Sequence, residues 1–131
     1  MDRYDRIIRD VQRKTEEELL RWEVVAAGRY STVLLNPHRV VRAFKAEYFV
    51  GGRDYTLLFT EKKIDTHDEF GDSTEVCGFE LFILDLDQQV VLSLYEGLVD
   101  RDDLLRLSGL IDAHNDRVKT FFEAFGEPGA A

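Results

Sequence analysis

This chain of 131 residues has only one cysteine and no long apolar run. Its single cysteine, Cys77, can form neither an internal disulfide nor a cysteine-based zinc cage, which favours a reducing compartment. No apolar run is long enough to span a bilayer, and the opening residues lack the apolar stretch of a signal peptide. We therefore expect a soluble, cytoplasmic protein.

The sequence also lacks the motifs that mark common chemistries. It has no Gly-x-Ser-x-Gly elbow, no Walker glycine loop and no Gly-x-Gly-x-x-Gly segment. Basic residues are not interleaved with aromatic ones on any acid-free stretch, as they are in many nucleic-acid-binding proteins. These absences favour a non-enzymatic protein that needs no cofactor and binds neither nucleic acid nor membrane.

Basic charge is scarce, and the shortage lies in the second half. The whole chain holds 17 basic and 26 acidic side chains, a formal net charge of −9. Residues 1–60 hold 11 basic and 9 acidic side chains, whereas residues 61–131 hold 6 and 17, a net charge of −11. Such a surface repels phosphates and anionic lipid and attracts basic partners, and it also keeps a protein soluble.

Hydrophobic periodicity predicts a helix followed by a sheet. The opening segment repeats apolar residues at helical spacing, from Tyr4 to Val11, which indicates an amphipathic helix. From Trp22 onward the chain contains short β-prone runs. Two of these runs flank the pair Gly51-Gly52, and a two-glycine connection predicts a tight hairpin because primed turns need positive φ.

The middle of the chain predicts an exposed loop and then the central strand. Residues 65–76 contain too few apolar groups for a core element. Residues 79–86 are apolar on both faces in their middle, as a strand covered on both sides would be. We expect the apolar members of this strand to be buried: Phe79, Leu81, Phe82, Ile83 and Leu84.

A closing helix completes the predicted fold. Asp100 could cap it, and its apolar stripe runs from Leu104 to Phe125. The fold class is therefore α+β, with an N-terminal helix, an antiparallel meander of four or five strands and a C-terminal helix, the helices lying mainly on one face of the sheet. Residues 1–126 form one domain, and residues 127–131 form a loose tail.

This layout resembles small, mostly uncharacterised bacterial proteins. They have an N-terminal helix, a Thr-rich or Glu-rich junction before a Trp-Glu pair, a meander with an Asp-x-Asp turn, and a closing helix. The matching pieces here are Thr15 to Trp22-Glu23, Leu84 to Asp87, and Asp103 to Ile111. The resemblance spans most of the chain and implies the fold, but no activity.

Acidic residues gather between residues 65 and 75 and again at the start of the last helix. We interpret them as partner-binding residues: Asp65, Asp68, Glu69, Asp72, Glu75, Asp100, Asp102 and Asp103. His67 lies within the first group, but the spacing places no glycine at the sixth position that an EF-hand loop requires. We predict a docking face for a protein partner of basic charge, and no metal site.

A second set of residues offers an alternative site. Asp85 and Asp87 stand two residues apart and so project from one face of a strand, and His114 lies in the stripe of the last helix. If the three converged on a cleft between sheet and helix, they could serve a small ligand or an enzymatic reaction. An aspartate at a strand end more often begins a turn, so we assign no catalytic residue.

The sequence thus favours a non-enzymatic, acidic protein-binding module, such as an adaptor, an immunity-type inhibitor or a regulator. The alternative from another class is an acidic secretion-type chaperone, which shares the small size and the low pI of about 4.8. Such folds interrupt the sheet with a middle helix. Helices on one face alone would leave Phe49, Leu58 and Leu84 exposed on the other, which predicts a homodimer.

Overall fold

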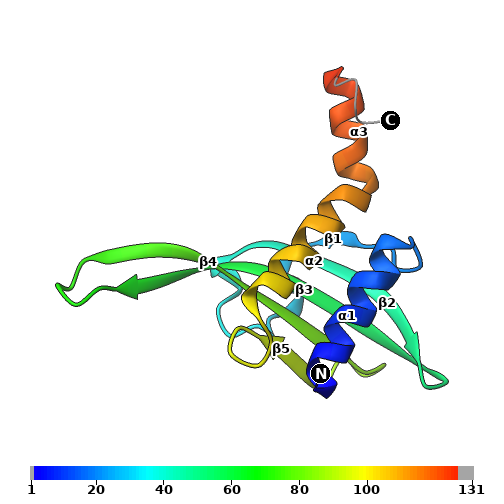
Figure 1. Cartoon of the computed structure of the whole chain (residues 1–131), viewed down its shortest axis with the longest axis horizontal. Helices are drawn as coiled ribbons and strands as arrows, with labels where there is room; N and C mark the ends of the chain where they lie inside the picture. The colour runs from blue at the N-terminus through cyan, green and yellow to red at the C-terminus, as the bar shows by residue number, and fades with distance from the viewer. Residues whose placement is uncertain (1, 127–131) are drawn as a thin grey trace.

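The chain folds as a helix, an antiparallel meander and two further helices (Figure 1). The structure, a computed structural model, describes residues 2–126, so the predicted tail at 127–131 lies outside the described residues. Its elements are α1 (Arg3–Glu16), β1 (Glu23–Val25), the 3-10 turns η1 (Ala27–Tyr30) and η2 (Pro37–Arg39), β2 (Val40–Val50), β3 (Arg53–His67), β4 (Ser73–Leu84), β5 (Val90–Tyr95), α2 (Arg101–His114) and α3 (Asp116–Phe125). The predicted α+β class is confirmed. None of the described helices is long and apolar enough to cross a membrane.

The strands follow one another across the sheet in the order of the sequence, β1-β2-β3-β4-β5, each antiparallel to the next. The predicted hairpin is confirmed: Gly51 and Gly52 join β2 to β3 with φ of 62° and 75°. A side chain at either position would strain the backbone in this left-handed region. The two glycines therefore set the register of β2 against β3.

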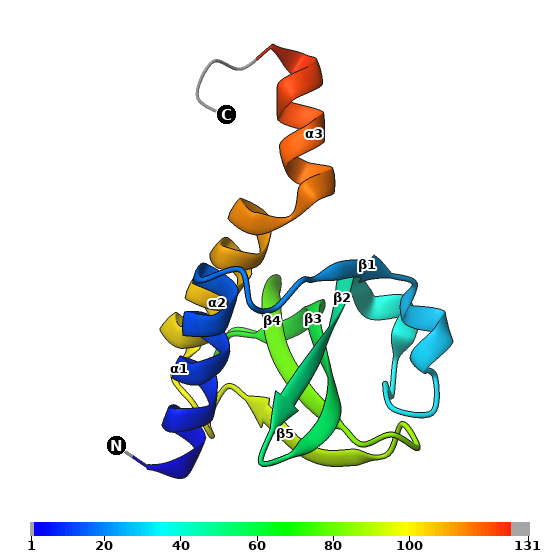
Figure 2. The ribbon, with the colours of Figure 1, turned by 90° about the vertical axis from the view of Figure 1, so that its right-hand side faces the viewer.

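Helices α1 and α2 lie side by side on one face of the sheet (Figure 2). Their apolar stripes meet the sheet at Phe59, Leu81 and Leu94, all fully buried. The strand predicted to be central contributes its whole apolar run, since residues Phe79, Leu81, Phe82, Ile83 and Leu84 are at most 8% exposed. Its predicted burial is confirmed, but its predicted central position is wrong, because β3 is the middle strand of the described sheet and this run belongs to β4.

The opposite face of the sheet is covered by the chain between β1 and β2. Leu34 and neighbouring apolar groups of this segment pack on Leu58, Phe82 and Leu84. The expected open apolar patch is therefore wrong for Leu58 and Leu84, which are fully buried, whereas Phe49 remains 64% exposed. Irregular chain, rather than a second subunit, therefore covers this face.

The predicted loop at residues 65–76 is also wrong. β3 continues to His67 and β4 begins at Ser73, so only the residues between them form the turn. The pairs Ile64–Val76 and Thr66–Thr74 lie opposite each other in this hairpin. Their β-branched side chains favour extended backbone, which explains why a polar stretch forms strands.

The last helix is broken in two, although its apolar stripe predicts one continuous helix. Asn115 separates α2 from α3 with extended ψ of 121°. Its side chain is buried and donates a hydrogen bond from Nδ2 to the carbonyl oxygen of Trp22 at 3.3 Å. The turn directs α3 away from the sheet (Figure 2), and the rings of Phe121 and Phe125 stack there 6.1 Å apart, largely exposed.

Candidate protein-binding surfaces

The far end of the β3–β4 hairpin, residues 63–77, extends beyond the rest of the sheet, and we call it the arm. β2 pairs with β3 no farther than Lys62, and β5 begins to pair with β4 only at Glu80. Past these residues no third strand of the described chain pairs with the hairpin, although Arg39 of η2 forms an ion pair with Asp65, and Figure 1 shows the hairpin reaching away from the body. The arm is thus a two-stranded ribbon that exposes both of its faces.

The tip of the arm, residues 68–72, is a turn that Asp68 holds together. Its carboxylate accepts hydrogen bonds from the backbone N–H groups of Phe70 at 2.9 Å and Asp72 at 2.8 Å. Gly71 adopts the positive φ of 82° that closes the turn. This geometry leaves the Phe70 side chain 82% exposed at the outermost point of the hairpin.

The five acidic residues predicted on this segment have different roles. Asp65 pairs with Arg39, and Glu75 pairs with Lys63 at 3.3 Å, so both are neutralised within the chain. The carboxylate of Asp68 accepts the hydrogen bonds that hold the turn. Glu69 and Asp72 take part in no ion pair between described side chains, so their charges are the ones available to a partner.

The three acidic residues at the start of α2 form a separate group. Asp100 is the N-cap residue, without a capping bond from its side chain. Asp102 and Asp103 lie in the first turn, where the positive end of the helix dipole stabilises carboxylates. Arg101 donates to the carbonyl oxygen of Cys77 at 2.7 Å, which fixes this end of α2 at the base of the arm. Five residues of strand, about 17 Å, separate that base from Asp72.

The residues of the alternative site lie in two different places. Asp85 accepts hydrogen bonds from the N–H groups of Asp87 at 2.9 Å and Gln89 at 3.0 Å, and so holds the β4–β5 turn. His114 ends α2, and its Nδ1 lies 3.4 Å from a carboxylate oxygen of Glu18. The 440 Å³ pocket that His114 lines includes neither aspartate.

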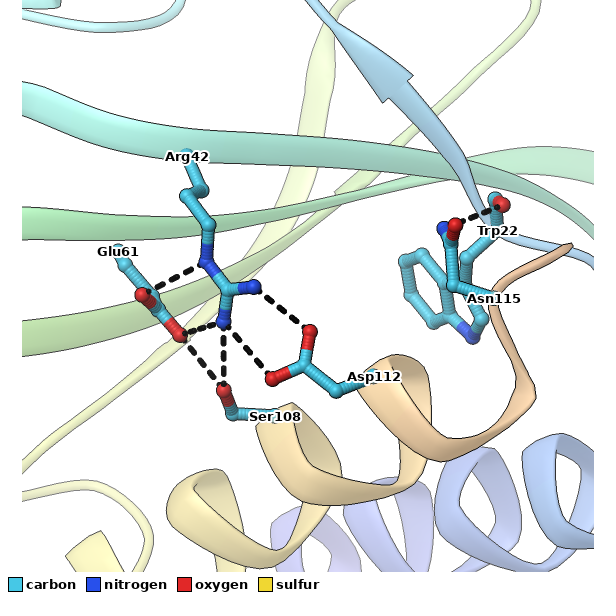
Figure 3. A network of polar contacts seen from close by, with 6 residues as sticks. All are labelled: Trp22, Arg42, Glu61, Ser108, Asp112 and Asn115. Carbon is cyan, nitrogen blue, oxygen red and sulfur yellow. Dashed lines mark hydrogen bonds and ion pairs between the residues drawn. The ribbon is translucent and has the colours of Figure 1, made fainter. Parts of the chain in front are cut away.

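A partly buried polar network, which the sequence did not reveal, joins α2 to the sheet (Figure 3). Arg42 on β2 donates to both carboxylate oxygens of Glu61 on β3, at 2.6 and 3.0 Å, and to those of Asp112 on α2, at 2.6 and 3.1 Å. Ser108 donates to Glu61 at 2.6 Å. Four of these five bonds come from the Arg42 guanidinium, which thus joins two strands and one helix.

The electrostatics of this network are those of a structural clamp. Burial raises the pKa of Glu61, but the hydrogen bonds from Arg42 and Ser108 outweigh burial and leave that pKa below its ordinary value. Hydrogen bonds to Glu61 and Asp112 raise the pKa of Arg42. A carboxylate held ionised by a fixed cation is a poor proton donor or acceptor near neutral pH, so we assign the network to stability.

Metal chemistry finds no support in the described part of the chain, where no group of three or more His, Cys, Asp or Glu side chains could hold an ion. His67 instead lies with its Nδ1 3.3 Å from the Ser73 hydroxyl oxygen across the arm.

Comparison with known proteins found no family model, no curated protein and no solved structure that matches this chain. The arm and its tip are therefore interpreted from their own geometry.

Proposed function

We propose that this protein is a non-enzymatic binding module that docks on a basic protein through the tip of its arm. The observation that carries the proposal is the position of Phe70. An aromatic ring that is 82% exposed stands at the end of a two-stranded arm, with the carboxylates of Glu69 and Asp72 beside it in the turn. An adaptor, an immunity-type inhibitor or a regulator would use such a tip.

The chemistry of the tip fits a basic surface that has an apolar pocket. Aromatic side chains are enriched among the few residues that supply most of the binding free energy in interfaces. The surrounding carboxylates attract a basic partner over a distance and guide its approach, which raises the association rate. Phe70 would then be the anchor, and Glu69 and Asp72 would steer.

The arm also suits this use because it costs the fold little. Its outer residues contribute nothing to either buried cluster, so the ring at the tip can enter a partner without uncovering the core. Asp68 keeps the turn in one conformation, which reduces the entropy lost when the tip is immobilised on binding.

Neither alternative function has a specific observation in its favour. The strands of the sheet follow one another with no α-helix between them in the described chain, whereas secretion-type chaperones have a middle helix. A small-ligand or enzymatic site made by Asp85, Asp87 and His114 would need the three side chains to share a pocket. We therefore carry only the binding module forward.

Affinity capture with matched variants tests the proposal. The full-length protein, immobilised, retains its partner from an extract of the cells that produce it. The variant E69Q/F70A/D72N removes the ring and the two free charges but leaves Asp68 to hold the turn, so we expect the partner to be lost. Its control, E47Q/F49A/D54N, removes the same three residue types at the other hairpin, where Phe49 is also exposed.

The two variants change charge and exposed apolar area alike, so only position distinguishes them. Loss of the partner from the tip variant, with retention by the control, is the expected result. Equal retention by both variants, or loss from the control alone, would contradict docking through the tip. Circular dichroism of each variant confirms that the fold is intact before capture.

A further inference from the structure

β5 is the outermost strand of the sheet, and within residues 2–126 it is paired on one side only. β4 provides that pairing, from Glu80–Tyr95 to Leu84–Val90. A register shift between Ile83 and Leu84 leaves Val91 without a partner on β4. The other side of β5 therefore presents backbone N–H and C=O groups that an additional strand could bind, except at its end, where the carbonyl oxygen of Tyr95 accepts hydrogen bonds from the N–H groups of Leu98 and Val99.

The outer edge of β5 carries no charge. Residues 88–95 read Gln-Gln-Val-Val-Leu-Ser-Leu-Tyr in a chain of which 33% is charged. Val91 is 56% exposed and Tyr95 is 49% exposed. Proteins protect their sheet edges with charges, prolines or very short strands, and the opposite edge is protected in this way, because β1 has only three residues and begins with Glu23.

We infer that β5 pairs with β5 of a second copy of this chain, antiparallel, so that one sheet continues through both copies. The distribution of charge indicates where two copies of this chain can meet. Each copy has a net charge of −9, so two copies repel each other over most of their surfaces. The uncharged strand is an edge where two such chains can meet without placing like charges opposite each other.

Symmetry restricts the register of this pairing. A two-fold axis between antiparallel edge strands runs normal to the sheet and keeps each side chain on its own face, so a residue must pair with one an even number of positions away. Pairing Ser93 with Ser93 of the partner subunit satisfies this rule. Val91 then lies opposite the partner's Tyr95, an aromatic and β-branched pair of the kind that stabilises antiparallel strands.

This interface is small, and it has a distinctive dependence on salt. A single added strand falls at the low end of specific interfaces, so we expect a dissociation constant of about 1 to 100 µM. Salt screens the repulsion between the two acidic copies but leaves the apolar strand pairing intact. The dimer should therefore become tighter as ionic strength rises, the opposite of what the arm predicts for a basic partner.

Paired charge variants test both the dimer and its register. In light scattering, the mean mass of the full chain should rise from 15.2 kDa towards twice that value as the concentration increases to about 1 mM, well above the expected dissociation constant. The variant V91K/Y95K places like charges opposite each other across the axis and should give 15.2 kDa, even though it lowers the overall repulsion. The variant V91E/Y95K places opposite charges there and should restore the dimer.

A cysteine at the axis gives an independent measurement. In the variant C77S/S93C, oxidation should produce a disulfide-linked dimer, because the two cysteines face each other. The wild type, whose Cys77 is exposed on the arm, should stay monomeric on a denaturing, non-reducing gel. A monomeric wild type in light scattering, a dimer that V91K/Y95K leaves intact, a monomeric V91E/Y95K or an unlinked S93C variant would each overturn the inference.

Discussion

Arg42 is the residue that joins α2 to two strands of the sheet through polar contacts. Its guanidinium joins Glu61, which is only 8% exposed, to Asp112 on the helix. Removing the arginine would leave a buried carboxylate without its cation, and such a loss costs far more than a surface ion pair contributes. The two strands and α2 are therefore coupled through one side chain.

The ionisation of Glu61 makes this clamp sensitive to acid. Its pKa in the folded protein lies below the ordinary value of 4.5, because hydrogen bonds from Arg42 and Ser108 outweigh burial. Its stabilising contribution is complete above that ordinary value and is lost as pH falls through the folded pKa. In E61Q this contribution is missing at every pH.

We therefore expect the free energy of unfolding of E61Q to lie below that of the wild type at pH 7, and the difference to shrink as pH falls below about 4. Urea unfolding at a series of pH values measures it. The exposed residue Glu23 provides the control, since E23Q should follow the wild type throughout. A difference between E61Q and the wild type that stays constant with pH would contradict the assignment.

Local patterns allowed some of these residues to be predicted, and distance in the sequence hid the others. The buried run around Phe82 and the turn at Gly51-Gly52 follow from neighbouring residues alone. The Arg42 network does not, because Glu61 and Asp112 lie 19 and 70 residues away along the chain. A lone arginine in a strand gives no sign of which acidic residues the fold brings to it.

At the scale of elements, the arm is the least supported part of the sheet. From Thr56 to Lys62, β3 pairs with both β2 and β4, and Leu57, Leu58 and Phe59 are fully buried. Beyond Lys62 the same strand pairs only with β4 in the described chain, and its residues are exposed. One continuous strand thus passes from the core into solvent.

Hydrogen exchange should divide β3 at Lys62. Amides of residues 57–61 should exchange at a rate close to that of global unfolding, whereas those of residues 63–67 should exchange much faster through local opening of the arm. Amide exchange followed by NMR or mass spectrometry measures both segments in one experiment. Equal protection on the two sides of Lys62 would show that the arm is part of the cooperative core.

The polar composition of the arm predicts a loop, whereas the symmetric spacing of its β-branched residues indicates the hairpin that forms. The β-branched residues Ile64, Thr66, Thr74 and Val76 are spaced evenly about Phe70, a pattern that indicates a hairpin. The break between α2 and α3 had no such signal. It depends on the bond from Asn115 to Trp22, which lies 93 residues away.

At the scale of the whole molecule, the two proposed surfaces differ in charge. The acidic tip of the arm would attract a basic partner, and the uncharged edge at β5 would let two acidic copies meet. One surface is the tip of the hairpin between β3 and β4, and the other is the outer edge of β5, so one copy can use both. A dimer would then present two arms, which increases the avidity for a partner that has more than one docking site.

The association rate of the captured partner, measured at two salt concentrations, tests docking through the tip most directly. The Debye length falls from about 10 Å at 0.1 M salt to about 3 Å at 1 M, so electrostatic steering is lost over this range. For E69Q/D72N we predict slower association at 0.1 M and a weaker salt dependence, whereas E47Q/D54N should match the wild type. An unchanged rate and salt dependence in E69Q/D72N would contradict docking through the tip of the arm.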